Sequence, residues 1–567
     1  MKHGIILIVA SALLLTSSCS KLMNYNELSV YDKDYITQTY KDVGGFITGM
    51  YNAVPYDWSY SGGAMLAAAS DECEYSIMGN GIEDFFNGSW GPTNAKSNWS
   101  DMYSAISNCN DYLDQMLGLT FDEYKLAADY DKQMYRYHNF EYEARFMRAY
   151  FYFMLVRQYG DVPMISADMS LEQINSLSRT PADDVFQFIF DECNAIKDKI
   201  IKDYYNLGDL ALSPAEPGRV NQRGVLALRA QAALYWASPL FNKSNDASRW
   251  RTAATYYKEL IAACEEAGNV LDPKYDDLWA TKNHSNTNSR NEIIFARRIG
   301  TNDTIEKNNY PIGIEGGTGG NCPSQNLVDA YDMKNGTPID DPQSGYDPQN
   351  PYANRDPRLA LTVAVDGDKW PTVYNTALQL YEGGRNAAPL TNATTTGYYL
   401  KKICHGAIDL RANSRYKTDD HSAVIYRLGQ AYLDYAECVF RVLGSADATN
   451  SEFPVSAREL ANKTRIRAGV GQFPAGMSND VFWERYKKER MVELAFEGHR
   501  FWDVRRWKEA DKYKDIKRMK ITREGNKNVY KVETVTRAWN DKMYLFPVPY
   551  SEILKNPNLA PNNPGWE

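Results

Sequence analysis

Three well-separated segments of the chain carry an apolar repeat with the period of a helix. They span residues 143–163, 224–242 and 426–444, and in each one small residues alternate with large rings on one face. The shared faces are formed by Phe146, Ala149, Tyr150, Phe153 and Val156; by Val225, Leu228, Ala232, Tyr235 and Trp236; and by Leu428, Ala431, Tyr432, Tyr435, Ala436 and Val439. Small residues let a neighbouring helix approach while rings fill the gaps, as in tetratricopeptide-type helical pairs. The pattern predicts a mostly α fold on a tetratricopeptide-like scaffold, with an ordinary helical bundle as the alternative.

Long polar stretches rich in Gly, Pro, Asn and Asp separate these helices. Irregular insertions of this length on a rigid scaffold usually carry function, so we expect recognition to reside in them. The stretches are residues 283–290, 301–323, 335–357 and 386–396. Shorter β-like runs at 292–299 and 359–365 predict a minor strand component.

The N-terminus has the pattern of an export signal. Lys2 is followed by an apolar run from Ile5 to Leu15, by small polar residues and then by Cys19. The run is too short to span a bilayer, which takes about 20 residues as a helix. We therefore expect a removed signal peptide with Cys19, in a lipobox-like position, as the lipidated first residue. Thr16 departs from the aliphatic residue more usual at its position, and an ordinary cleavage site with a chance cysteine is the alternative.

Charge and cysteine usage narrow the class of protein. The net charge of -9 and the lack of any dense Lys/Arg block argue against a nucleic-acid partner. Eight cysteines show no CxxC or other ligand spacing, and lipidation of Cys19 would leave an odd number, so any disulfide pairing is incomplete. Most of the others lie in helical patterns, where the expected role is that of a small buried hydrophobe.

The usual catalytic motifs are absent from the sequence. Its six histidines form no metal-binding helical pair, and there is neither a nucleophile elbow nor a phosphate-binding loop. The best carboxylate set is Glu489, Glu493 and Glu497, which share one helical face. Arginines follow closely at 490, 500, 505 and 506 and would hold these carboxylates ionised, so we interpret the set as a structural network rather than an acid–base pair. The sequence predicts no catalytic residue, no cofactor and no metal site.

Aromatic residues favour a binding function. The chain has 41 Tyr, 12 Trp and 20 Phe, and many of these rings fall outside the periodic helices. Tyr and Trp combine a rigid apolar face with one hydrogen-bonding edge. A sugar presents CH groups on its face and hydroxyls on its rim, so stacked rings with flanking Asn, Asp or Arg would suit it.

The C-terminal part carries a more specific pattern. Residues 461–469 read ANKTRIRAG, 489–508 read ERMVELAFEGHRFWDVRRWK, and 544–566 read YLFPVPYSEILKNPNLAPNNPGW. These strings resemble the closing signature of the SusD/RagB family of outer-membrane nutrient-uptake lipoproteins of Bacteroidetes. Further blocks resemble the family in the family's order, so the resemblance covers essentially the whole mature chain. They lie at 148–165, 331–339, 354–359 and 426–438.

The resemblance implies an architecture and a partner. It implies a SusD-like α/α superhelix with long irregular loops and minor β, as one interwoven globule divided into a signal peptide (1–18), an N-terminal SusD-like region (19–215) and a remainder (216–567). It also implies a non-catalytic, lipid-anchored lid that binds oligosaccharides on a SusC-like TonB-dependent transporter of the outer membrane, facing the cell surface. The residues after Cys19, SKLMNYNE, lack the acidic cluster often associated with surface export in this phylum, so that orientation rests on the resemblance alone.

Site residues are also carried over by the resemblance. Family ligands are held by variable aromatic loops, which here indicate Trp58, Asp71, Tyr75, Trp90, Asn94, Tyr310 and Asn321 as ligand-binding residues. Trp99 and Trp279 have instead the positions of core anchors. The family's signature residues are expected to be structural: Arg490, Glu493, Glu497, Gly498, Arg500 and Trp507 in the last helices, and Pro547, Pro549, Asn563, Pro564, Gly565 and Trp566 in the tail.

Three alternatives to a glycan-binding lid stay open at this point. One is a RagB-like lid that binds peptides. Another is a surface glycoside hydrolase with an unrecognised carboxylate pair. A third is a structural lipoprotein that only stabilises its barrel partner.

Overall fold

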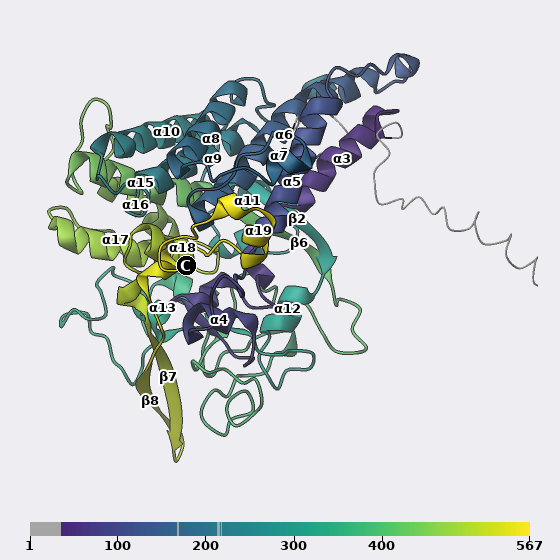
Figure 1. The fold of residues 1–567 in the computed structure, drawn as a ribbon. Helices are drawn as coiled ribbons and strands as arrows, with labels where there is room; N and C mark the ends of the chain where they lie inside the picture. The colour runs from purple at the N-terminus through teal and green to yellow at the C-terminus, as the bar shows by residue number, and fades with distance from the viewer. Residues whose placement is uncertain (1–35, 167–168, 212–215, 217) are drawn as a thin grey trace, which may run out of the picture.

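Long helices packed side by side form the framework of the molecule (Figure 1). The computed structural model describes residues 36–166, 169–211, 216 and 218–567, so Cys19 and the signal peptide lie outside the described residues. The long helices are α3 (Tyr40–Asn52), α5 (Trp99–Gln115), α6 (Tyr130–Tyr159), α8 (Ala182–Ile196), α9 (Gln222–Ala237), α10 (Ala247–Glu266), α15 (Leu428–Leu443), α16 (Ala457–Ala468) and α17 (Asn479–Glu493). From α5 to α16 each of these packs against the next in chain order. This serial packing is that of a tetratricopeptide-like scaffold and confirms the predicted mostly α fold.

The three helices predicted from periodicity are all present. Residues 143–163 form the second half of α6 and continue just past its end at Gly160, whose φ of 72° places it in the left-handed region. The eight residues from 149 to 156 are buried without interruption, so α6 runs through the core rather than along its surface. Helix α9 begins at an N-cap, where the Asn221 side chain accepts the N–H of Gly224. Helix α15 ends at Gly444, again with positive φ.

The rest of the described chain is largely irregular and holds short helices and four two-stranded antiparallel sheets. The short helices are α4 (Asp84–Asn87), α7 (Leu171–Ile174), α11 (Thr287–Glu292), α12 (Thr304–Asn309), α13 (Gln325–Ala330), α14 (Pro357–Thr362), α18 (Arg500–Arg506) and α19 (Tyr550–Lys555). The sheets pair β1 (Cys73–Tyr75) with β3 (Asn321–Pro323), β2 (Ile293–Asn302) with β6 (Asp419–Arg427), β4 (Val363–Ala364) with β5 (Tyr399–Leu400), and β7 (Asp515–Glu524) with β8 (Lys527–Thr536). The β7–β8 hairpin projects away from the helical part in Figure 1.

One strand prediction is confirmed and the other is largely wrong. The run at 292–299 becomes β2. The run at 359–365 lies mostly in α14, and only Val363 and Ala364 pair as a strand. The reason lies just upstream, where Asp356 caps the helix by accepting the N–H of Arg358 and Pro357 occupies the first turn.

A buried layer of ion pairs joins the C-terminal helices to the middle of the chain. We call it the ion-pair layer; it consists of Glu292, Arg358, Arg427, Arg465, Arg467, Glu489, Glu493 and Glu497. Arg358 contacts Glu489 at 2.7 Å and Glu493 at 2.8 Å. Arg427, with no exposed side-chain surface, contacts Glu493 at 2.7 Å and Glu497 at 2.8 Å. Burial opposes ionisation of Glu493, but the surrounding arginines outweigh it and hold the pKa of Glu493 well below its usual range.

The predicted structural network is therefore present, but its glutamates do not pair with the arginines that lie next to them in the sequence. The nearby Arg490 pairs with Asp434 and Asp503 instead. The carboxylates at 489, 493 and 497 are neutralised largely by arginines from other segments of the chain. These long-range ion pairs link the C-terminal helices to several other elements at once.

Other structural predictions are confirmed by burial. All seven cysteines in the described chain are free and buried, and Trp99 and Trp279 lie in the core. In the tail, the Asn563 side chain donates to the carbonyls of Tyr159 and Phe546, each at 2.8 Å. Within the described residues, no helix combines the length and apolar character needed to cross a bilayer.

Candidate functional site

Four of the seven residues predicted to contact ligand are buried, among them Asp71 and Trp90. Asp71 forms a two-pronged ion pair with Arg500, with oxygen-to-nitrogen distances of 2.7 and 2.8 Å. Trp90 packs against Phe546 and Trp566, with ring centroids 4.8 and 5.2 Å apart. Both side chains therefore hold the C-terminal segment against the loop that carries them.

Tyr310 and Asn321 are buried in the same way. The Tyr310 hydroxyl donates to the carbonyl of His405 at 2.7 Å. The Asn321 side chain accepts the N–H of Met65 at 2.9 Å and donates to the carbonyl of Gly63 at 3.0 Å. Because the polar atoms of these residues are occupied within the protein, they support the loops in this structure, and their ligand role stays a prediction.

The remaining three, Trp58, Tyr75 and Asn94, are half-buried and keep exposed atoms. Tyr75 lies opposite Asn321 in the β1–β3 pair, so the structure brings these two predicted residues together. Trp58 lies apart from them, edge-on to the ring of His421 at 6.1 Å, and lines a small hollow of about 100 Å³. The seven residues thus do not converge on one hollow.

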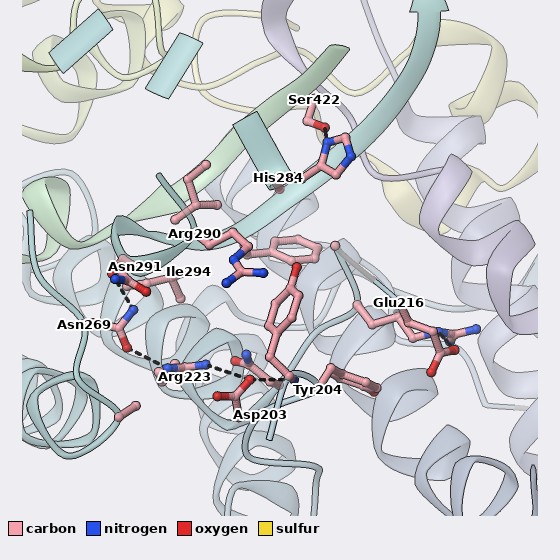
Figure 2. A pocket seen from close by; sticks show the side chains of 18 of the residues that line it. Asp203, Tyr204, Glu216, Arg223, Asn269, His284, Arg290, Asn291, Ile294 and Ser422 are labelled. Atoms are coloured by element: carbon pink, nitrogen blue, oxygen red, sulfur yellow. Dashed lines mark hydrogen bonds and ion pairs between the residues drawn. The ribbon is translucent and has the colours of Figure 1, made fainter. Parts of the chain in front are cut away.

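A more polar site lies where the scaffold meets the β2–β6 pair (Figure 2). This hollow of about 210 Å³, which we call the polar hollow, is enclosed by the α8–α9 connection, the C-terminal end of α10, and the segment from η7 (Asn283–Ser285) through α11 to β2. Its wall contains the arginines Arg219, Arg223, Arg290 and Arg298 against the carboxylates Asp203 and Glu216. A second hollow of about 250 Å³ shares Glu216, Arg219 and Arg298 with it, so the two adjoin.

Local turn chemistry positions the walls of the polar hollow. Asp203 accepts the backbone N–H of Tyr205 at 2.9 Å and the side-chain amide of Asn206 at 2.6 Å, which shapes the turn after α8. Gly218 has a φ of +90°, and a Cβ there would lie 3.2 Å from Arg298, so glycine lets this loop approach β2 closely. Asn286 caps α11, which places Arg290 in the last turn of that helix.

The arginines of the polar hollow differ in how they are paired. Arg219 contacts Glu216 at 2.7 Å and the buried Glu143 at 2.8 Å. Arg298 contacts Asp420 at 2.5 Å. Arg219 and Arg298 are therefore neutralised by protein carboxylates, as structural arginines usually are.

Arg223 and Arg290 are not closely paired. The nearest carboxylate of Arg223 is Asp203, at the outer limit of 4.0 Å, and its short contact is to the neutral amide of Asn269 at 2.6 Å. Arg290 forms no ion pair with any residue in the described part of the chain, and its buried Nε atom has no hydrogen-bond partner there. Its guanidinium lies 4.1 Å from the ring centroid of Tyr205, which is 43% exposed, and Figure 2 shows it extending into the hollow.

Burial shifts the pKa values of His284 and Tyr205 in this site. It lowers the pKa of His284, and the neighbouring Arg298 lowers it further, so the imidazole is neutral at pH 7. Burial raises the pKa of the Tyr205 hydroxyl although Arg290 opposes the shift, so that ring is neutral as well. The net positive charge of the hollow therefore comes from its arginines.

These features suit recognition rather than bond-breaking. An exposed ring, side-chain amides and guanidinium donors converge on one concave surface, which is the usual make-up of a polar ligand site. Among the described residues, no cluster of His, Cys, Asp or Glu has an arrangement that could hold a metal ion.

Sequence reasoning found only part of this site. The stretch 283–290 was expected to carry recognition, and it supplies Asn283, His284 and Arg290 to the wall. Tyr205 in the α8–α9 connection, Arg223 in the first turn of α9 and Asn269 just after α10 were missed because they lie in separate segments, where polar residues are common and carry no distinctive signal.

Known proteins resemble the chain over most of its length. Residues 276–566 match the model of the SusD family, and residues 74–214 match a family described as starch-binding and associating with the outer membrane. A SusD-like protein of Formosa agariphila is 24% identical over 424 residues, which cover 72% of this chain and 69% of that protein.

Solved structures share the fold. A SusD-like protein from Bacteroides fragilis superposes with a TM-score of 0.74 at 22% identity, covering 94% of this chain and 98% of that one. A laminarin-binding SusD-like protein superposes with a TM-score of 0.61 at 20% identity, covering 93% of this chain and 99% of that one.

Proposed function

The chain belongs to the SusD family, and from that premise we propose that it is an outer-membrane lipoprotein that binds oligosaccharides and delivers them to a SusC-like TonB-dependent transporter. Family membership supports carbohydrate binding in association with the outer membrane. The proposal adds the lipid anchor on Cys19, the orientation toward the cell surface, the transporter partner and the absence of catalysis. The laminarin-binding relative supports a glycan as the ligand class.

One observation carries the proposal for this chain: the polar hollow places the half-exposed ring of Tyr205 beside guanidinium and amide donors. A sugar ring needs an apolar face to stack on and donors for its hydroxyls, and both lie within this hollow. We also propose Trp58, Tyr75 and Asn94 as contacts for a longer glycan, because each keeps exposed surface.

Calorimetry of the purified protein against neutral and acidic plant and host polysaccharides tests the binding step. We expect binding to at least one glycan, a loss of about tenfold in affinity for Tyr205→Ala, and near-normal affinity for Tyr205→Phe, which keeps the ring. Binding of peptides without binding of any glycan would replace this function by that of a peptide lid. Unchanged glycan affinity in Tyr205→Ala would remove the polar hollow from the proposal.

Two further experiments test anchoring and delivery. Cys19→Ala should release the protein from the membrane fraction, because acyl chains on that cysteine supply the anchor. Purification from detergent-solubilised membranes should recover a TonB-dependent barrel together with the wild-type protein. If the Cys19→Ala protein stays with the membrane, or if no barrel co-purifies, the corresponding part of the proposal is wrong.

A hydrolase is the second candidate, because one carboxyl pair borders a hollow. Asp57 and Glu497 line the hollow beside Trp58, and burial raises the pKa of Asp57 to about 7, as a general acid requires. Glu497, however, is held by Arg427 at 2.8 Å and by Lys402 at 2.7 Å, which leaves it little freedom to act on a substrate. Release of reducing ends that is abolished in Asp57→Asn would establish the hydrolase instead.

A further inference from the structure

We propose that the polar hollow selects anionic glycans. In this proposal Arg290 binds the carboxylate of a uronic acid unit, and Arg223 supplies a second positive charge nearby. This inference rests on the proposed glycan-binding function and names the class of glycan. It follows from the pairing state of the arginines rather than from their number.

The guanidinium of Arg290 has unused hydrogen-bonding capacity. In the described part of the chain it meets no carboxylate, and its Nε atom is buried without a partner. The other arginines of this wall have a carboxylate or amide partner, so Arg290 is distinguished by its lack of one in the described chain. Its terminal nitrogens are not among the buried unsatisfied atoms, so they can donate to a ligand oxygen in the hollow.

The neighbouring protein carboxylates already form hydrogen bonds or ion pairs with other residues. Asp203 accepts hydrogen bonds from Tyr205 and Asn206 within its own turn. Glu216 is paired with Arg219, and also with Arg136. The segments 212–215 and 217, which adjoin Glu216 in the chain, contain no acidic residue. A counter-charge for Arg290 is therefore best supplied by a ligand.

The surroundings of Arg290 suit a carboxylate on a sugar. Stacking on Tyr205 holds the planar guanidinium in place, and a held guanidinium can donate two parallel hydrogen bonds to a carboxylate. The lining of the hollow also includes Asn291 and Asn221, whose amides could bond ring hydroxyls. An anionic peptide would use the same charge but not the combination of exposed ring and amides, so we favour the glycan.

Binding of matched charged and neutral ligands tests the proposal. The probes are oligosaccharides from polygalacturonate, alginate and glucuronate-containing glycans, each beside its carboxyl-reduced counterpart, with a sulfated oligosaccharide and hexaglutamate as further arms. We expect carboxyl reduction to weaken binding about 10- to 100-fold, and binding of the acidic forms to weaken as salt is raised.

Variants assign the effect to Arg290. Arg290→Gln should remove the preference for the acidic form over its reduced counterpart, and Arg290→Lys should keep part of that preference because it keeps the charge. The matched control is Arg415→Gln, which changes an exposed arginine outside the hollow and should leave the preference intact. Thermal unfolding of each variant checks that the fold is retained.

The outcomes separate this inference from the function on which it rests. Equal binding of charged and reduced glycans by the wild-type protein, an undiminished preference in Arg290→Gln, or binding of neutral glycans alone overturns the anionic selectivity and leaves glycan binding standing. A preference for sulfated over carboxylated probes keeps the anion site and replaces the uronate by a sulfate ester. Binding of hexaglutamate but of no glycan overturns both proposals.

Discussion

The ion-pair layer and the polar hollow use the same side chain in opposite ways. In the layer, Arg427 has no exposed side-chain surface and contacts carboxylates of Glu292, Glu493 and Glu497 at 2.7 to 2.8 Å. In the hollow, Arg290 meets no carboxylate among the described residues and rests on a half-exposed ring. A guanidinium that is saturated by protein acids holds segments together, whereas one left unsaturated is available to a ligand. The pairing state of an arginine, rather than its burial or residue type alone, therefore distinguishes arginines that support the fold from those available to a ligand.

The sharpest way to test this contrast is to remove one member of the ion-pair layer. Arg427→Met leaves three buried carboxylates short of a counter-charge, so we expect the free energy of unfolding to fall by about 3 to 5 kcal/mol. Urea unfolding followed by circular dichroism measures the change. The control Arg251→Met breaks a surface pair with Glu452 and should cost less than about 1 kcal/mol. A similar loss in both variants would contradict the contrast.

Asp71 offers a smaller test, because it was predicted to bind ligand but lies buried against Arg500. Asp71→Asn leaves the Arg500 guanidinium without its anionic partner and should lower the free energy of unfolding by about 2 to 3 kcal/mol. Affinity for glycan should stay within about twofold of wild type if Asp71 only supports its loop. A large loss of affinity with unchanged stability would instead restore a direct contact.

The pH dependence of stability provides a third test. Burial, reinforced by Arg490, lowers the pKa of His499 to about 4, below its usual value near 6.5. Between these two values the unfolded chain takes up a proton that the folded protein does not, so stability falls as the pH falls, by up to about 1.4 kcal/mol per unit. His499→Gln removes this contribution, and urea midpoints measured at pH 7, 6 and 5 should then decline less steeply than in wild type. Equal slopes in the two proteins would refute the assignment.

The smallest expected effect on stability comes from the hollow itself. Since Arg290 forms no ion pair in the described chain, Arg290→Gln should change the free energy of unfolding by no more than about 0.5 kcal/mol. Thermal unfolding measures this directly. A destabilisation comparable to that of Arg427→Met would mean that Arg290 is a structural residue, which would end the distinction between the two regions.

Features that depend on neighbouring residues could be predicted from the sequence. The helices at 143–163, 224–242 and 426–444 follow from local periodicity, and Trp99 and Trp279 were correctly assigned to the core. The strand at 359–365 failed because a strong local helix start, Asp356 followed by Pro357, outweighed the β-like composition after it.

Features that depend on distant pairings could not be predicted. The acidic set at 489–497 was correctly interpreted as structural, but Arg358 is 131 residues from its partner Glu489, and no local pattern reveals such a match. The polar hollow draws on segments near 203, 223 and 290, and the free state of Arg290 exists only once all of them are in place. Trp90 shows the same dependence on distant segments, because this ring in a polar loop packs against the C-terminal tail.

The ion-pair layer also constrains the order in which segments of the chain can pack during folding. A chain that ended before Glu489 would bring Arg358, Arg427, Arg465 and Arg467 together with only Glu292, Asp356 and Asp332 of their described partners left to offset them. The remaining excess of positive charge away from water opposes closure of this centre. We therefore expect the middle of the chain to complete its packing only once the segment from Glu489 onward is present.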